Sequence, residues 1–186
     1  MNHIRFGLFT TFLLVVTLSY SQGKLVRQKI NSSISMLIAS DFFPMETEKQ
    51  QAKYLSDRTP LAMYSTPDAA VDLGINVNSS AWEETDMSII HQFYKANLLQ
   101  LFDEVRWIQD TVIQVKGRTF ARFELEGTIL DENASFKGQN SITKYLFVQY
   151  TLFDNKILLF HFNSPIGRKD YWKESVLIMM DSISIR

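Results

Sequence analysis

The chain of 186 residues lacks cysteine, has only seven glycines and four prolines, and carries no excess of basic side chains. The lack of cysteine excludes disulfide bonds, thiolate metal sites and lipid attachment at an N-terminal cysteine. The glycines are scattered and form no G-x-G-x-x-G or other phosphate loop. With 19 basic and 20 acidic residues, the chain has no positive field that would attract nucleic acid or anionic lipid.

Long hydrophobic runs are also missing. The apolar segment at residues 8–18, LFTTFLLVVTL, is too short to favour a stable transmembrane helix. Arg5 precedes it without any acidic residue, and Ser19 and Ser21 follow it at the spacing that a signal peptidase requires. These features predict a signal peptide over residues 1–21 with cleavage after Ser21. A retained membrane anchor is the alternative interpretation.

Cleavage would leave a single domain over residues 22–186, beginning at Gln22. Its 165 residues would carry 18 basic and 20 acidic side chains, because the leader contains one arginine and no acid. An exported chain without cysteine is commoner in bacteria than in animals. We therefore expect a protein of the bacterial envelope or secretome, periplasmic or extracellular, with no stable membrane span after cleavage and no nucleic-acid partner.

Hydrophobic periodicity predicts a mixed α+β domain without internal repeats. Strands are expected at residues 33–39, 61–65, 71–77, 104–115, 118–130, 141–153 and 156–165. Helices are expected at residues 45–56, from the segment 79–85 to about Phe102, and at 169–182. Lys116-Gly117 and Asp154-Asn155 suit tight hairpin turns, so the four later strands should form an antiparallel meander.

Two features of the pattern concern the faces of the sheet. In the strand 71–77, apolar residues occupy every second position, so Asp72 should face outward. Residues 145–148, YLFV, are instead apolar without interruption, which predicts that both faces of the sheet are at least partly covered. The expected architecture is an antiparallel β-sheet covered by helices on both faces, an α/β/α sandwich.

The start of the helix that ends near Phe102 has two possible caps. Ser80 with Glu83 would form a capping box, whereas Thr85 would act as a cap with Asp86 in the first turn. The predicted apolar stripe of this helix consists of Met87, Ile90, Tyr94, Leu98 and Leu101.

Several segments in this order resemble the PsbP-like superfamily. They are SDFFP, PLAMYSTPDAAVDLGINV followed by AWEETDM, GRTFARFELEG, KILLFHFNSP, and a final helix with an aromatic start that runs into DSISIR. The resemblance covers about residues 33–186 and is closest to the small exported bacterial branch. It implies a PsbP-like α+β domain with a non-enzymatic role as adaptor, assembly factor or partner-binding module. It supplies no catalytic residue, because the superfamily shares none.

The side chains capable of catalysis or metal binding form no recognisable constellation. His91 and His161 are the histidines of the predicted mature domain, and neither has a partner at H-x-x-x-H spacing. We interpret both as packed or surface residues, with His161 half buried and hydrogen-bonded. Ser164 lies near His161, but two neighbours on a strand do not make a triad, and the chain has no G-x-S-x-G elbow.

The acidic clusters also favour structural roles. Glu124 and Glu126 share one strand face with Arg122, which indicates a solvated ladder of ion pairs rather than an acid–base pair. Asp131-Glu132-Asn133 lacks the glycine and terminal glutamate of an EF-hand loop. We therefore predict a protein that is not an enzyme and has no catalytic, cofactor-binding or metal-binding residues and no cofactor.

Two aromatic residues in polar surroundings are the best candidates for a functional surface. Trp82 lies in the loop before the first long helix, and Phe136 lies between turn signals in the loop 131–141. Exposed aromatic residues of this kind are common anchors of partner surfaces. They suggest a binding or assembly module whose partner is another envelope or secreted protein. The structural alternative is that the rings fold back onto the chain.

A second class of function is also open. A small-molecule carrier or enzyme would use a pocket between sheet and helices, with His161 or Tyr150 as its polar group. Such a site requires a concave, partly apolar cavity with convergent polar groups.

Overall fold

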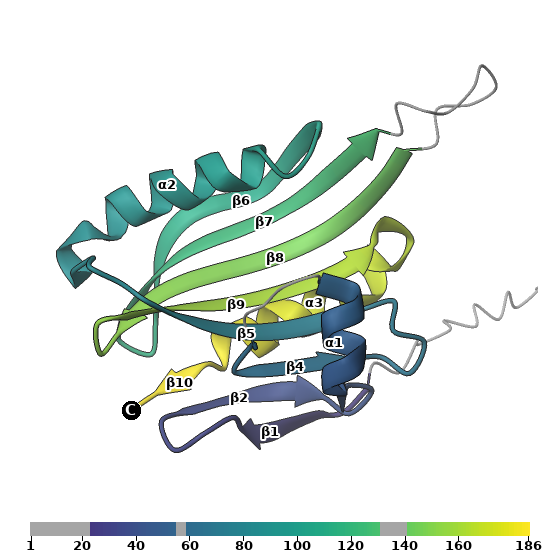
Figure 1. The fold of residues 1–186 in the computed structure, drawn as a ribbon, viewed down its shortest axis with the longest axis horizontal. Coiled ribbons are helices and arrows are strands. Elements are labelled where there is room, and N and C mark those ends of the chain that lie inside the picture. The colour runs from purple at the N-terminus through teal and green to yellow at the C-terminus, as the bar shows by residue number, and fades with distance from the viewer. Residues whose placement is uncertain (1–22, 55–58, 131–140) are drawn as a thin grey trace, which may run out of the picture.

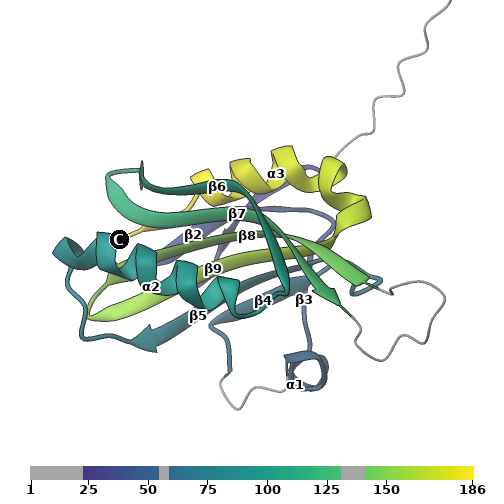
Figure 2. The same cartoon turned by 90° about the horizontal axis from the view of Figure 1, so that it is seen from above.

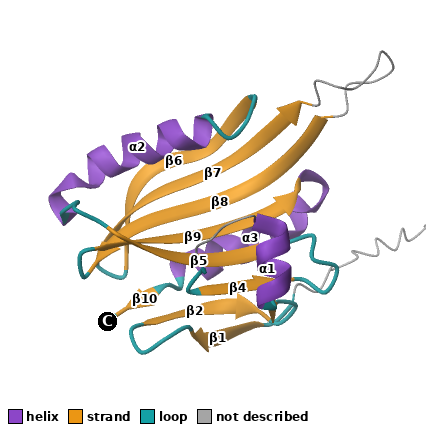
Figure 3. Cartoon of the chain, in the orientation of Figure 1, coloured by secondary structure: helices purple, strands orange, loops and turns teal. Residues whose placement is uncertain are grey.

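The computed structural model describes residues 23–54, 59–130 and 141–186, which form ten strands and three α-helices (Figures 1 and 3). The helices are α1 (Thr47–Tyr54), α2 (Met87–Leu99) and α3 (Lys169–Asp181), with short 3-10 turns at Glu84–Asp86 and Ile166–Arg168. The strands are β1 (Leu25–Lys29), β2 (Ile34–Ala39), β3 (Phe43–Pro44), β4 (Ala62–Ser65), β5 (Asp72–Ser79), β6 (Glu104–Val115), β7 (Arg118–Leu130), β8 (Ser141–Phe153), β9 (Lys156–Pro165) and β10 (Ser184–Ile185).

The strands form two antiparallel sheets. The larger sheet has the order β3-β4-β5-β9-β8-β7-β6, and the smaller has the order β1-β2-β10. The predicted antiparallel α+β class is therefore confirmed, but the prediction of one sheet is wrong. The strand expected at residues 33–39 lies in the small sheet, where the C-terminal strand β10 pairs with it. A two-residue strand such as β10 is too short to produce an alternating pattern that the sequence would reveal.

The four long strands β6 to β9 have the bounds that the sequence predicts. Their hairpins turn through Lys116 and Gly117, with φ of 49° and 80°, and through Asp154 and Asn155, with φ of 52° each. Positive φ at both central residues defines a type I′ turn, whose twist matches that of the flanking strands. The predicted meander is therefore confirmed, and its register is fixed locally.

The side chains of the large sheet divide between two hydrophobic clusters. Adjacent residues of a strand point to opposite faces, so Phe120 of β7 enters one cluster and Ala121 enters the other. The first cluster joins the sheet to β2 and α3 and includes Met36, Leu73, Phe147, Phe160, Phe162, Trp172 and Met180. The second joins it to α2 and includes Met87, Ile90, Phe123, Leu125, Val148 and Tyr150. The central strands are thus apolar on both sides, in agreement with the uninterrupted YLFV segment.

Helix α2 is shorter than the sequence predicts. It ends at Leu99 rather than near Phe102, and by Asp103 the chain has joined the sheet, where the Asp103 N–H donates to the Thr128 carbonyl at 2.9 Å. Leu101, expected on the apolar stripe, lies beyond the helix and is 62% exposed. The other predicted stripe residues are buried or half-buried, namely Met87, Ile90, Tyr94 and Leu98.

Asp72 in β5 does not face solvent as predicted. It is completely buried, because the residues around it on both faces of β5 are covered as well. Gly74, on the same face of β5, lies directly across from His161 of β9. A Cβ atom added at Gly74 would lie 2.1 Å from His161 Nε2, so the imidazole occupies the space that any side chain there would need. Glycine at this position is what allows His161 to pack against the neighbouring strand.

Replacing Gly74 with alanine is expected to lower the free energy of unfolding by about 1–3 kcal/mol, because overpacking displaces neighbouring buried groups. Denaturation by urea, followed by circular dichroism, measures this change. Gly167→Ala is the matched control, since no heavy atom lies within 4 Å of the added Cβ. Its effect should stay within about 0.5 kcal/mol. Equal effects of the two substitutions would contradict the close packing of His161 on Gly74.

Candidate functional site

The loop before α2 is held by local hydrogen bonds. The Glu83 N–H donates to Asp86 Oδ2 at 2.8 Å, and the Glu83 carboxylate accepts from the Asp86 N–H, which completes a capping box. Both caps considered from the sequence are therefore wrong. Ser80 instead accepts a hydrogen bond of 3.0 Å from the Trp82 N–H. The backbone on both sides of Trp82 is thus fixed, which fixes where the indole leaves the chain.

Trp82 lies beside an exposed apolar strip of α2. Its ring centroid is 6.3 Å from that of Phe93, and Trp82 is half-buried. Phe93 is 48% exposed, and Ile89, one turn before it on the same helix face, is 53% exposed. We call Trp82, Ile89 and Phe93 the α2 patch. It presents an aromatic and aliphatic surface that the described residues leave largely uncovered.

A chain of stacked rings connects the α2 patch to the core. Phe93 meets Tyr94 edge-on at 5.1 Å, and Tyr94 stacks on Tyr150 of β8 at 3.7 Å. Tyr150 in turn meets Phe123 edge-on at 6.2 Å. Burial raises the pKa of both tyrosines, so both hydroxyls are neutral at physiological pH. The patch therefore rests on packed rings rather than on a free helix surface.

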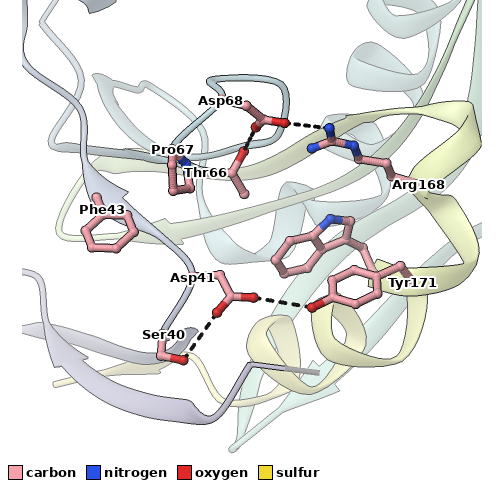
Figure 4. A pocket seen from close by; sticks show the side chains of 9 residues that line it. Ser40, Asp41, Phe43, Thr66, Pro67, Asp68, Arg168 and Tyr171 are labelled. Atoms are coloured by element: carbon pink, nitrogen blue, oxygen red, sulfur yellow. Dashed lines mark hydrogen bonds and ion pairs between the residues drawn. The ribbon is translucent and has the colours of Figure 1, made fainter. Parts of the chain in front are cut away.

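A separate pocket of about 700 Å³ opens between the start of β3, the turn from β4 to β5 and the start of α3 (Figure 4). Its lining combines apolar rings with acidic, basic and hydroxyl groups: Ser40, Asp41, Phe43, Thr66, Pro67, Asp68, Arg168, Tyr171 and Trp172. We call this the β3–α3 pocket. The mixture of aromatic walls with a few polar groups is typical of sites for small organic ligands.

Two polar pairs hold the β3–α3 pocket (Figure 4). Arg168 forms an ion pair with Asp68, which also accepts a 2.7 Å hydrogen bond from the Thr66 hydroxyl. These bonds, with that of Arg168 foremost, hold the pKa of Asp68 well below its usual range. The Tyr171 hydroxyl donates to Asp41 Oδ2 at 3.3 Å, and burial together with the Asp41 charge raises the pKa of Tyr171.

The polar groups predicted for a ligand pocket lie elsewhere. His161 packs on Gly74 and Tyr150 stacks on Tyr94, and neither lines the β3–α3 pocket. Ser164 is buried and, three residues along β9, points to the face opposite His161, so the two form no catalytic pair. Residues 23–54, 59–130 and 141–186 also contain no group of three or more side chains suited to a metal ion.

His91 is a packed residue, as the sequence interpretation expected. It is buried, stacks on Phe123 at 4.9 Å, and places Nε2 2.6 Å from Asp110 Oδ1 of β6. Asp110 also accepts a hydrogen bond from Lys95 of α2, whose ammonium lies 5.5 Å from the Trp107 ring centroid. These contacts fasten α2 to β6.

The predicted ladder at Arg122 and Glu124 is buried rather than solvated, with exposures of 4% and 7%. Arg122 donates to the side chains of Gln149 in β8 and Asp181 in α3. Glu124 accepts a 2.9 Å hydrogen bond from the Tyr145 hydroxyl. Each charged group therefore has a partner, as burial requires.

Glu126, the third member of the ladder, joins two other elements. Its carboxylate accepts hydrogen bonds of 2.7 Å from Arg106 of β6 and from Lys169 of α3. These cations, with Arg106 the stronger, hold the pKa of Glu126 below its usual value. The geometry is that of a structural ion network between β6, β7 and α3.

Some candidates from the sequence lie outside the described residues, and some residues of the two sites were not among those candidates. Phe136 and the segment Asp131-Glu132-Asn133 lie outside the described residues. Ile89 and Phe93 were missed as partners of Trp82, although their spacing of four residues places them on one helix face. The Asp68–Arg168 pair was also missed, and no local signal connects residues a hundred positions apart.

Comparison with known proteins agrees with this architecture. No family model and no curated protein matches the chain. Cyanobacterial PsbP from Synechocystis sp. PCC 6803 has a solution structure that matches with a TM-score of 0.60 at 12% identity, over 93% of this chain and 99% of that one. The chain has the PsbP-like fold. LpqN of Mycobacterium tuberculosis matches with a TM-score of 0.56 at 8% identity, over 87% and 90% of the two chains.

The resemblance predicted from the sequence is thus confirmed at the level of the PsbP-like fold. A variant of the protein Mog1 matches as well, with a TM-score of 0.51 at 10% identity over 87% of this chain and 96% of that one. Within residues 23–54, 59–130 and 141–186, no helix is both long enough and apolar enough to cross a membrane.

The stability of the fold should depend on the protonation of His161. Burial lowers the pKa of His161 to about 4, although the nearby Asp72 charge acts in the opposite direction. In the unfolded chain its pKa is about 6.5, so the unfolded state binds the proton more tightly. The free energy of unfolding should be highest above pH 6.5, fall between pH 6.5 and 4, and level off below pH 4.

Urea denaturation at several pH values measures this dependence. The contribution of His161 should be on the order of 3 kcal/mol, since a pKa difference of about 2.5 units corresponds to about 1.4 kcal/mol per unit. His161→Gln removes the titrating group, so the difference in slope between the two proteins isolates it from the carboxylates. Parallel curves for wild type and variant would contradict the burial of a neutral His161.

Proposed function

We propose that this chain is an exported, non-catalytic binding or assembly module of the bacterial envelope or secretome. Its partner is another envelope or secreted protein, which docks on the α2 patch. The observation that carries this proposal is the exposure of Ile89 and Phe93 beside the half-buried Trp82. Aromatic residues on a rigid base bind with little loss of conformational entropy, which makes them effective anchors for a protein partner.

The comparisons support a role at the envelope. The LpqN structure is described as that of a protein involved in cell envelope biogenesis. The leader predicted over residues 1–21, with Gln22 as the first mature residue, would bring this chain to the envelope or out of the cell. We also assign Phe136 to the partner surface, on the strength of its place between turn signals in the sequence.

The packing of the sheet limits where a partner can bind. We infer that both faces of the large sheet are covered, by α2 on one side and by α3 with the small sheet on the other. A partner then meets the outer surfaces of helices, the ends of hairpins or the edges of the sheets. The α2 patch belongs to the first of these surfaces.

The β3–α3 pocket supports a second candidate function, the binding of a small organic ligand. Its volume of about 700 Å³ falls within the range of ligand sites, and Trp172 and Phe43 supply aromatic walls. Arg168 and Tyr171 would bind polar groups of the ligand at the pocket entrance.

Cross-linking in intact cells tests the first proposal. A tagged copy with its leader should give one recurring adduct by mass spectrometry. Trp82→Ala and Phe93→Ala should each weaken the complex by about 2 kcal/mol, or roughly 30-fold, and Phe136→Ala should weaken it as well. Leu177→Ala, at a 41% exposed position of α3, is the matched control and should leave the adduct intact.

Two outcomes decide the matter. An adduct that survives Trp82→Ala and Phe93→Ala would remove the α2 patch as the docking surface. The same spectra report the first residue of the recovered protein, and any start other than Gln22 would refute cleavage after Ser21.

Nuclear magnetic resonance with a library of small aromatic acids and amides tests the pocket. Binding should shift the amide signals of residues that line the β3–α3 pocket, and Arg168→Ala should weaken acidic ligands about tenfold or more. Tyr171→Phe keeps the ring and removes one hydroxyl, so it should affect only ligands that bind this group. If no compound of the library shifts these signals at millimolar concentration, the β3–α3 pocket is not a site for such ligands.

A further inference from the structure

Among the described residues, strand β6 forms one edge of the large sheet, since β7 is its one strand neighbour there. From Gln109 to Val115 it pairs with β7 without interruption, over the register Gln109↔Glu124 to Val115↔Arg118. Figure 2 looks toward this edge, with β6 in view between α2 and α3. Seven residues of regular strand therefore have one side that no described strand pairs with.

The hairpin turn shows which backbone groups point away from the sheet. Val115 and Arg118 flank the two-residue turn, and such flanking residues exchange both of their backbone hydrogen bonds. Hydrogen-bonded and non-bonded positions then alternate along β6. Asp110, Val112 and Gln114 are consequently the residues whose N–H and C=O groups point outward. The Val112 carbonyl accepts a long, 3.4 Å bond from the Thr111 hydroxyl, consistent with a carbonyl on the open side.

The other sheet edges carry devices that discourage pairing, whereas this part of β6 does not. Strands β3 and β10 have two residues each, β3 includes Pro44, and β1 carries the basic residues Arg27 and Lys29. The first part of β6 has a register shift between Trp107 and Gln109, which bends the strand. The segment Gln109–Val115, QDTVIQV, contains no proline or lysine, and its single charge, Asp110, already bonds Lys95.

We propose that β6 pairs antiparallel with β6 of a second copy of this chain, in a symmetric dimer centred on Val112. Two outward-facing residues at the axis exchange their N–H···O=C bonds, so the two sheets join into one. The Val112 side chain, 41% exposed in the single chain, lies against its own copy. Such self-complementary pairing is what a two-fold axis requires.

The charges along β6 select this register. Centred on Val112, the pairing places Asp110 opposite Gln114 of the second copy, and Thr111 opposite Ile113. No like charges face each other. A register centred on Asp110 would place two carboxylates directly opposite, which is unfavourable. A register centred on Gln114 would run into the turn at Lys116-Gly117 and shorten the overlap.

A single introduced thiol tests the symmetric contact, because the natural sequence has no cysteine. Hydrogen-bonded antiparallel pairs have Cα atoms about 5.5 Å apart, within the range of a disulfide. Val112→Cys should therefore form a covalent dimer at least about tenfold faster than Leu177→Cys under mild oxidation, since pairing raises the effective thiol concentration. Leu177 is the matched control, because it is 41% exposed as well but lies on α3.

Sedimentation velocity over a concentration series tests the dimer without a covalent bond. The wild-type protein should approach twice the monomer mass, and Val112→Thr, which keeps the N–H and the branched shape, should do the same. Val112→Pro removes an N–H group that points away from β7 and therefore makes no hydrogen bond within the sheet. Gln114→Pro does the same at a second position. Both variants should remain monomeric. Circular dichroism verifies that the variants are folded.

A wild-type monomer at all concentrations would overturn the proposal. So would equal rates of cross-linking at positions 112 and 177, or a dimer that a folded proline variant leaves unchanged. The in-cell cross-link to a different protein is measured independently of sedimentation and disulfide formation. The dimer and the proposed docking function therefore fail or succeed separately.

Discussion

The burial of the central strands on both faces is the constraint on which the rest of the structure depends. Within β8, Phe147 belongs to one hydrophobic cluster and Val148 to the other. A shift of register by one residue would exchange these two side chains and every other residue of the strand between the clusters. The turn at Asp154-Asn155 prevents such a shift, because its two residues fix which positions of β8 and β9 pair. The docking sites of α2 and α3 follow from this pairing.

Within that frame, buried polar groups connect the layers. Arg122 and Gln149 lie on the face toward α3, and Arg122 reaches Asp181 at the end of that helix. Charged groups in such a place are stable only when they are paired, and removing one partner leaves an uncompensated buried charge. The cover over this face also explains why a solvated ladder was the wrong expectation. The alternation of side chains along β7 predicted which residues share a face. It did not predict that α3 would cover that face.

The parts of the fold that the sequence predicts are those with local causes. Strands β6 to β9 follow from alternating hydrophobicity and from turn residues that tolerate positive φ. The small sheet could not be predicted, because β10 has two residues and its pairing with β2 spans most of the chain. The same holds for the β3–α3 pocket, where Asp68 meets Arg168 only after folding. Trp82 was recognisable from its polar surroundings, whereas Ile89 and Phe93 became its neighbours only once the orientation of α2 was known.

The position of α2 relative to β6 connects the two proposed surfaces. Lys95 of α2 bonds Asp110 of β6 and lies over the Trp107 ring, and these contacts fasten the helix to the edge strand. Pairing of β6 with its copy about an axis through the sheet keeps both α2 helices on the same face. A dimer would then present two α2 patches toward the same side. A surface of three apolar side chains binds weakly by itself, but two linked copies can gain 10²–10⁴ in avidity for a partner that is itself repeated or symmetric. The edge strand would thereby set the strength of docking without contacting the partner.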